Sequence, residues 1–215
     1  MKRRSFVAAL GGTAALAVIG GARPHRAAAL HDGGVLLGVP TYAQQRNLSC
    51  EYAATVMAMA TFGAWVNEYE FDGIVGWSAN PHLGYRGEIT GWWGNTTDYG
   101  VYAEPLAGAV ENFGFWGDPF YAQGDSAALT TRLDNGLPTL VWMGLWGDTS
   151  FYEASEDGTS YKLASGMHVV TVRGYDETGV YVNDPAHGSS DFYDWGSFMS
   201  AWNVFDGMAL AVGPY

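Results

Sequence analysis

The stretch QQRNLSCEYAA, residues 44–54, holds the only cysteine of this 215-residue chain, where a polar loop gives way to an Ala/Met-rich pattern. Small and apolar residues recur at 3.6-residue spacing to about residue 65, which predicts a helix that begins at Cys50 with Ser49 as its N-cap. A thiol at a helix N-terminus is biased toward the thiolate by unpaired N–H groups and the helix dipole. We therefore expect Cys50 to be a nucleophile; the alternative is a small, buried core residue.

The first 29 residues have the three regions of an export signal. They comprise a basic segment (residues 2–4), an apolar run of 16 residues (6–21) and an Ala-Ala-Ala cleavage site (27–29). The basic segment continues as Arg-Arg-Ser-Phe-Val, which resembles the twin-arginine export motif, although paired arginines also occur in ordinary signals. We expect a signal peptide over residues 1–29 and one domain over residues 30–215, in a secreted or cell-envelope protein. An uncleaved membrane anchor is the alternative.

The predicted mature part is strongly acidic. It carries five basic and 22 acidic residues, a formal charge of −17. Such a surface repels nucleic acid and anionic membranes, so we expect neither as a partner after signal removal. Separately, we expect the protein to be a monomer. No His/Cys cluster has zinc spacing and no glycine-rich phosphate loop is present, so neither a metal nor a cofactor is expected.

Helical patterns dominate the first half of the domain and strand patterns the second. Helices are predicted at residues 50–65, 67–74, 102–113, 125–133 and 195–205. Strands are predicted at residues 120–122, 137–146, 168–175, 179–183, 191–193 and 208–212, with a hairpin or loop at 148–165. This order predicts an α+β fold with the N-terminal helix packed on an antiparallel sheet.

A cysteine nucleophile needs a base and a group that orients the base. His168 begins an apolar strand, which would fix its ring, although a buried neutral histidine is also common at such a place. The next strand ends at Asp184, and a short turn at 176–178 would bring both residues to one edge of a hairpin. Asp184 would then orient the imidazole; alternatively, its Asp-Pro pair simply ends the strand. Asn183 is a weaker orienter because alternation points it to the other face.

An oxyanion donor and a binding surface complete the predicted site. Gln44 lies six residues before Cys50, where its amide could donate to an oxyanion together with the Cys50 N–H. The irregular, aromatic-rich segment 76–100 is typical of a binding loop or lid. Its aromatic residues either pack in the core or line a groove for a peptide or glycan. The candidates for substrate binding are Trp92, Trp93 and Tyr99.

These motifs resemble a known family. VPTYAQ (residues 39–44), Cys50 six residues on, GMHVV (166–170) and NDP (183–185) together resemble cysteine-peptidase family 39 and its exported relatives. These are papain-like peptidases best known for removing double-glycine leader peptides from bacteriocins. The resemblance covers roughly residues 35–215.

The resemblance implies a papain-like fold and a role for each candidate. Cys50 would be the nucleophile, His168 the base, Asp184 the orienter and Gln44 the oxyanion donor. One departure matters: family members commonly have glycine after the cysteine, and this chain has Glu51. A carboxylate that faced the sulfur would disfavour the thiolate.

Three functions fit these features. The first is an exported cysteine peptidase that hydrolyses peptide or related amide bonds through a Cys50 thioester, with a peptide or protein as substrate. The second is a non-catalytic papain-like module that binds peptide or cell-wall ligands. The third is a transamidating enzyme on the same fold, in which an amine replaces water.

Overall fold

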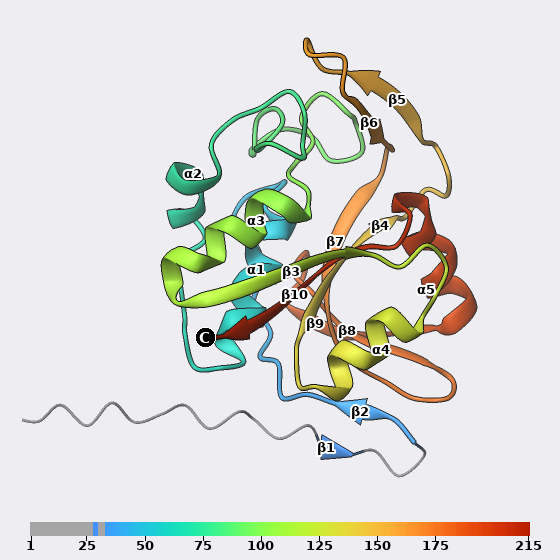
Figure 1. Ribbon diagram of the computed structural model, residues 1–215. Coiled ribbons are helices and arrows are strands. Elements are labelled where there is room, and N and C mark those ends of the chain that lie inside the picture. Colours follow the sequence, from blue (N-terminus) through green and yellow to red (C-terminus); the bar gives the residue numbers. More distant parts are fainter. Residues whose placement is uncertain (1–27, 30–32) are drawn as a thin grey trace, which may run out of the picture.

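The computed structural model describes residues 28–29 and 33–215 (Figure 1). The predicted export signal therefore lies outside the described residues, except for Ala28–Ala29. These two residues form β1, which pairs with β2 (Val35–Leu36). None of the helices in the described ranges is long and apolar enough to span a bilayer.

The core of the fold is an eight-stranded sheet in which every pairing is antiparallel. Along one path the strands run β1-β2-β7-β4-β10-β3, while β8 pairs with β7 and β9 pairs with β8. The remaining strands of this sheet are β3 (Phe115–Tyr121), β4 (Thr139–Gly144), β7 (Met167–Tyr175), β8 (Gly179–Asp184), β9 (Ser189–Asp194) and β10 (Met208–Pro214). A separate hairpin of β5 (Phe151–Ala154) and β6 (Ser160–Leu163) occupies the range predicted as a hairpin or loop.

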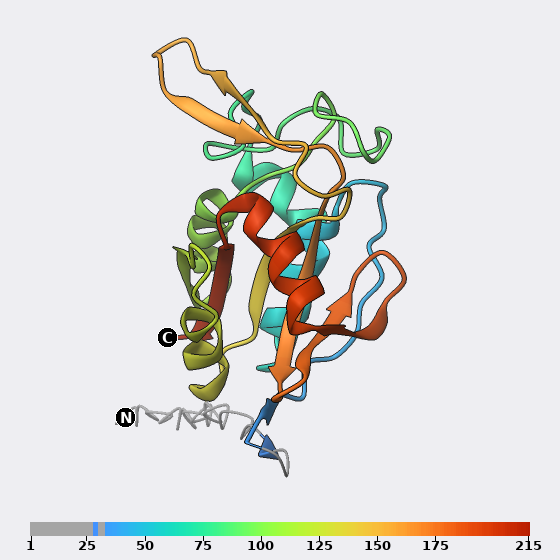
Figure 2. The ribbon, with the colours of Figure 1, turned by 90° about the vertical axis from the view of Figure 1, so that its right-hand side faces the viewer.

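Helices lie on both faces of the sheet. The α-helices are α1 (Cys50–Ala60), α2 (Glu70–Val75), α3 (Ala103–Val110), α4 (Ala127–Asp134) and α5 (Trp195–Trp202). Two 3₁₀ turns, η1 (Glu111–Phe113) and η2 (Asn203–Phe205), extend α3 and α5. In Figure 1, α1, α2 and α3 lie on one side of the sheet and α4 and α5 on the other, and Figure 2 shows α5 in front of the sheet with α1 behind it. The α+β fold with the first long helix packed on an antiparallel sheet is confirmed.

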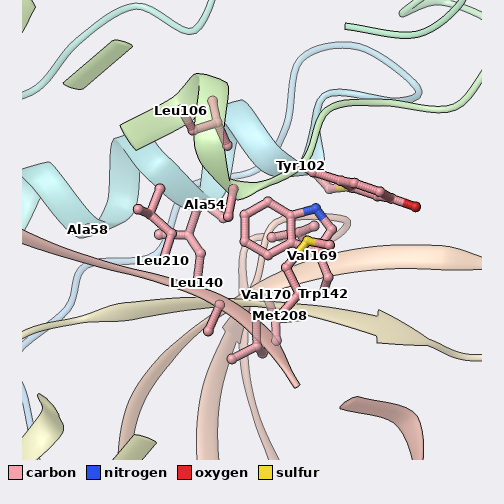
Figure 3. Packing of buried hydrophobic residues seen from close by; sticks show 14 of the residues in the cluster. Ala54, Ala58, Tyr102, Leu106, Leu140, Trp142, Val169, Val170, Met208 and Leu210 are labelled. Carbon is pink, nitrogen blue, oxygen red and sulfur yellow. The ribbon is translucent and has the colours of Figure 1, made fainter. Parts of the chain in front are cut away.

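Helix α1 is buried on every side, and its composition explains why it can be. All eleven of its residues are buried, and four of them are alanines. Figure 3 shows Ala54 and Ala58 on the face toward Leu140 and Leu210 of the sheet, and these small side chains let the helix pack close to the strands. The Thr171 hydroxyl of β7 donates to the Ala54 carbonyl at 3.0 Å, which fixes the position of α1 along β7. Each Val or Met buried along α1 contributes about 1.5–3 kcal/mol.

Several boundaries differ from the sequence prediction for physical reasons. Helix α1 ends at Ala60 rather than near residue 65, because the chain turns through Gly63 at φ +89°. Strand β3 is longer than predicted because it pairs with β10 along its whole length. Ser49 is the N-cap by position, but its side chain does not cap α1; its hydroxyl lies 2.9 Å from a Glu68 carboxylate oxygen.

Candidate active site

The loop before α1 is anchored so that Cys50 has a fixed place. Arg46 binds Glu68 at 3.2 Å and Asp72 at 2.7 Å, which ties the loop to the region of α2. Asn47 donates to carbonyl groups of the segment 76–100. Cys50 is the first residue of α1, and its side chain is 5 % exposed. Its own N–H has no protein acceptor among the described residues, so it remains available as a donor at the helix N-terminus.

The hairpin of β7 and β8 brings the predicted base and orienter together. His168 Nε2 lies 2.7 Å from Asp184 Oδ1, and the same oxygen accepts the Ala186 N–H at 2.8 Å. Burial opposes ionisation of Asp184, but the hydrogen bond and charge of His168 outweigh it and lower the pKa of Asp184. Asn183 is not available as an orienter, since it is buried and its amide donates to the Val39 carbonyl.

One cavity joins the histidine pair to the cysteine. It has a volume of about 620 Å³, and its walls include Cys50, His168, Asp184 and Gln44. The backbone of Val169, next to His168, hydrogen-bonds the Cys50 sulfur. Because Nε2 of His168 is committed to Asp184, Nδ1 is the ring nitrogen left for the sulfur or a substrate.

The Gln44 amide is bound to its own loop. Its Nε2 donates to the carbonyls of Arg46 and Asn47, each at 2.8 Å. Its Oε1 is buried without a hydrogen-bond partner among the described residues. Both amide protons are therefore used in this structure, and donation to an oxyanion requires one of them to exchange partners.

The aromatic candidates separate into two groups. Trp92 and Trp93 line the cavity, and Trp93 Nε1 donates to the Met167 carbonyl at 2.6 Å. The proposal that Tyr99 lines a binding groove is wrong. Tyr99 is 5 % exposed and belongs to the hydrophobic core, where its hydroxyl accepts the Ala164 N–H. Tyr85 is likewise buried and donates to the Leu48 carbonyl.

The cavity also contains residues that the sequence did not single out. Leu145 follows β4 and contributes an apolar wall, and Arg46 and His187 add polar groups. His187 lies three residues after Asp184, and this spacing within the turn after β8 was a signal that it would be close. His82 lies elsewhere, in a pair with Glu104, and His31 falls outside the described residues.

Comparisons with known proteins bear on the family and the fold of this chain. The model of the Peptidase C39-like family matches residues 36–210. The chain belongs to the peptidase C39-like family. No curated protein sequence matches it.

Solved structures share the family's fold. A C39-like peptidase from Bacillus anthracis has a TM-score of 0.72 at 21% identity, over 86% of this chain and 99% of that one. A double-glycine motif protease of an AMS/PCAT transporter, in complex with its leader peptide, has a TM-score of 0.52 at 18% identity, over 84% of this chain and 94% of that one. The peptidase domain of Streptococcus ComA has a TM-score of 0.51 at 14% identity, over 82% of this chain and 99% of that one.

The residue after the cysteine shapes the electrostatics of this family member's site. The Cys50 sulfur lies 3.3 Å from Glu51 Oε2. Burial, followed by the neighbouring charge of Glu51, raises the pKa of Cys50 well above its usual value, and the bond from the Val169 backbone only partly offsets this. The bias toward the thiolate expected from the helix N-terminus is therefore opposed by the surroundings of the thiol.

Proposed function

We propose that the protein is a cysteine peptidase that hydrolyses peptide bonds through a thioester on Cys50, with His168 as base and Asp184 as its orienting group. The observation that supports this most strongly is the 2.7 Å hydrogen bond between His168 and Asp184, in the cavity that also contains the thiol at the N-terminus of α1. Membership of a peptidase family supports the same reaction class.

Each group has one task in the proposed reaction. His168 Nδ1 takes the proton of the Cys50 thiol, and the thiolate attacks the carbonyl carbon of the peptide bond. The Cys50 N–H and the Gln44 amide stabilise the oxyanion, after Gln44 exchanges one of its loop carbonyls for it. His168 then gives its proton to the leaving amine. Water, deprotonated by His168, attacks the thioester, and the acid is released as the thiol re-forms.

The cavity walls favour a peptide segment as substrate. Trp92 and Trp93 provide large, rigid apolar surfaces beside the thiol, and Leu145 adds to them. The related double-glycine motif protease binds a leader peptide, and we carry over only the substrate class, a segment of polypeptide.

We also propose that the peptidase acts outside the cytoplasm. The support is the predicted export signal, with its basic segment, apolar run and cleavage site before residue 30. Expression of the full chain followed by N-terminal sequencing of the exported product would test this, and the expected new N-terminus lies at about residue 30. Recovery of the protein only from the cytoplasm would overturn the proposal, and an exported protein that retains residues 1–29 would identify an uncleaved anchor.

The peptidase proposal is tested by mass spectrometry on a library of peptides incubated with the protein. Cleavage products are expected with the wild type and not with Cys50→Ala. A Cys50-bound acyl group, trapped by rapid acid quench, would add the mass of the N-terminal fragment to the protein. Tight binding of peptides without any cleavage would instead identify a binding module, and transfer of the acyl group to added amines in preference to water would identify a transamidating enzyme.

Alkylation of Cys50 tests the role of His168 without a substrate. Iodoacetamide labelling is expected to slow at least about tenfold in His168→Ala, because thiolate formation loses its proton acceptor. His82→Ala is the matched control, since His82 also contacts a carboxylate, at 2.9 Å, but does not line the cavity. Equal labelling rates in wild type and His168→Ala would contradict the proposed function.

A further inference from the structure

Glu51 is a buried acidic side chain to which the proposed mechanism gives no task. It is fully buried, and none of the ion pairs among the described residues includes it. Burying a carboxylate without a cation is costly, and the cost falls when the group keeps its proton. A fully buried carboxyl group that takes part in none of these ion pairs and lies next to the candidate nucleophile calls for a specific explanation.

The backbone around Glu51 is shaped to hold its carboxyl group. Oε1 accepts the Val101 N–H at 3.0 Å. Gly100 has φ +140°, and a Cβ atom there would lie 1.8 Å from Oε1. Only glycine fits at this position, because both the backbone conformation and the space require it. The carboxyl group therefore links the first turn of α1 to the chain just before α3, fifty residues away in sequence.

The two oxygens of this carboxyl group cannot have the same role. Oε1 accepts an N–H and so is the carbonyl-like oxygen, which leaves Oε2 to carry a proton when one is present. Oε2 is the atom that faces the Cys50 sulfur at 3.3 Å. The contact can form in two ways: the thiol donates to a carboxylate, or a neutral carboxyl group donates to a thiolate. One proton lies between the two atoms in both cases.

Within residues 28–29 and 33–215, no cationic side chain forms an ion pair with the ionised form of Glu51. The titratable groups that feel the charge of Glu51 are Cys50 and the tyrosines of α1 and of the segment 76–100, namely Tyr52, Tyr85 and Tyr99. Beyond the sulfur lie His168 of β7 and its partner Asp184 of β8. The guanidinium groups of Arg46 and Arg86, whose charges reach the same tyrosines, are each paired with other carboxylates.

We propose that Glu51 is a positioning residue that keeps its proton in the reactive form of the site and donates it from Oε2 to the Cys50 thiolate, whereas its ionised form keeps Cys50 as an unreactive thiol. This inference rests on the proposed function, since it assumes that Cys50 reacts as a thiolate with His168 as its proton acceptor. It extends that function by assigning the residue that sets the protonation state in which the peptidase works.

The direction of the pH dependence follows from a count of protons. The reactive form has a thiolate, an imidazolium and a neutral Glu51. When Glu51 releases its proton to solvent, the imidazolium proton returns to the sulfur, which leaves a thiol, a neutral imidazole and a carboxylate. Burial raises the pKa of Glu51 to about 7. The thiolate population, and with it the reactivity of Cys50, therefore falls as the pH rises through about 7.

The test is the pH profile of Cys50 alkylation by iodoacetamide in wild type and Glu51→Gln. Glutamine keeps the acceptor for Val101 and a donor for the sulfur but cannot ionise. The ratio of the Glu51→Gln rate to the wild-type rate is expected to rise about tenfold between about pH 6 and about pH 8, because a titrating group changes population tenfold for each pH unit beyond its pKa. A ratio that stays constant across this range would overturn the proposal.

Two controls keep this outcome separate from failure of the proposed function. Glu104→Gln removes a carboxyl group that is only partly buried and that binds His82 and Tyr121. This variant is expected to leave the wild-type pH profile unchanged. Alkylation of His168→Ala at the wild-type rate would refute the proposed function itself, whatever Glu51→Gln does.

A measurement that needs no Glu51 variant covers the case in which Glu51→Gln does not fold. Ultraviolet absorbance of the thiolate, taken as the difference between wild type and Cys50→Ala, is expected to decrease between about pH 6 and about pH 8. A steady increase over the same range would overturn the proposal.

Discussion

Two histidine–carboxylate pairs in this molecule have nearly the same geometry and very different surroundings. His168 and Asp184 are 2.7 Å apart, and His82 and Glu104 are 2.9 Å apart. The first pair is largely buried at a strand end and shares its cavity with Cys50. The side chains of the second pair are about one-third exposed, and the hollow of about 680 Å³ that they line contains no cysteine or hydroxyl side chain.

The comparison shows that a bonded imidazole is not sufficient for chemistry. His82 packs edge-on against Tyr102, with ring centroids 4.7 Å apart, and Glu104 also accepts the Tyr121 hydroxyl at 2.6 Å. These contacts connect the segment 76–100, α3 and β3. The second pair is thus a structural connection, whereas the first shares its cavity with a thiol at a helix N-terminus.

The largest effect is expected when the imidazole of the first pair is removed. His168→Ala is expected to reduce kcat/KM for a cleaved peptide more than about 10⁴-fold, because both the base and the acid of the proposed reaction are lost. His82→Ala is expected to remain within about twofold of the wild type, since its ring does not line the cavity. Similar losses in the two variants would remove the distinction between the pairs.

A smaller effect is expected at the carboxylates. Asp184→Asn keeps the shape of the side chain but no longer accepts the imidazole N–H as an anion, so His168 can adopt the wrong tautomer. A decrease in kcat of about 10²–10⁴-fold is expected, with little change in KM. Steady-state kinetics would measure kcat and KM separately. Glu104→Gln is the matched control, and its kcat is expected to be unchanged. A wild-type kcat in Asp184→Asn would exclude the orienting role.

The next prediction concerns the core around Tyr102, the residue that packs against His82 of the second pair. Tyr99 lies beside Tyr102, and its hydroxyl accepts the buried Ala164 N–H at 3.0 Å. Tyr99→Phe is expected to lower the free energy of unfolding by about 1–3 kcal/mol, because that N–H loses its partner. KM is expected to stay constant, as Tyr99 does not line the cavity. Urea denaturation and peptide kinetics together test this, and a raised KM with unchanged stability would return Tyr99 to the binding surface.

The smallest predicted effect tests the binding surface beside the first pair. Trp92 lines the cavity and is 85 % exposed, so it is free to contact a peptide. Trp92→Ala is expected to raise KM about fivefold, corresponding to about 1 kcal/mol, with kcat nearly constant. Trp77→Ala, at another exposed tryptophan outside the cavity, is the control. A change in kcat alone would show that Trp92 does not act through ground-state binding.

The sequence predicted those parts of the fold that depend on local pattern. The start of α1 at Cys50 follows from helical periodicity, and the proximity of His168 and Asp184 follows from one hairpin with a short turn. The irregular segment 76–100 has no periodicity, so whether its aromatic residues face the core or the cavity depends on tertiary contacts. Tyr99 was misplaced for that reason.

The contacts that were missed join residues far apart in the chain. Gly100 and Val101 enclose the carboxyl group of Glu51, yet nothing near Glu51 in the sequence indicates them. The Ser49 hydroxyl was expected to cap α1 and instead contacts Glu68, which lies nineteen residues later. Periodicity gives no information on which of two available partners a polar side chain will choose.

The burial of α1 has a consequence for the lifetime of the thiol in an oxidising medium. Cys50 is the chain's only cysteine, and 5 % of its surface is exposed, within a cavity walled by Trp92 and Trp93. A disulfide needs two Cα atoms about 4.4–6.8 Å apart, an approach that the cavity walls deny to the Cys50 of another folded copy. Folded molecules are thereby protected from covalent dimerisation in an oxidising medium, whereas small reagents and extended peptides retain access to the sulfur.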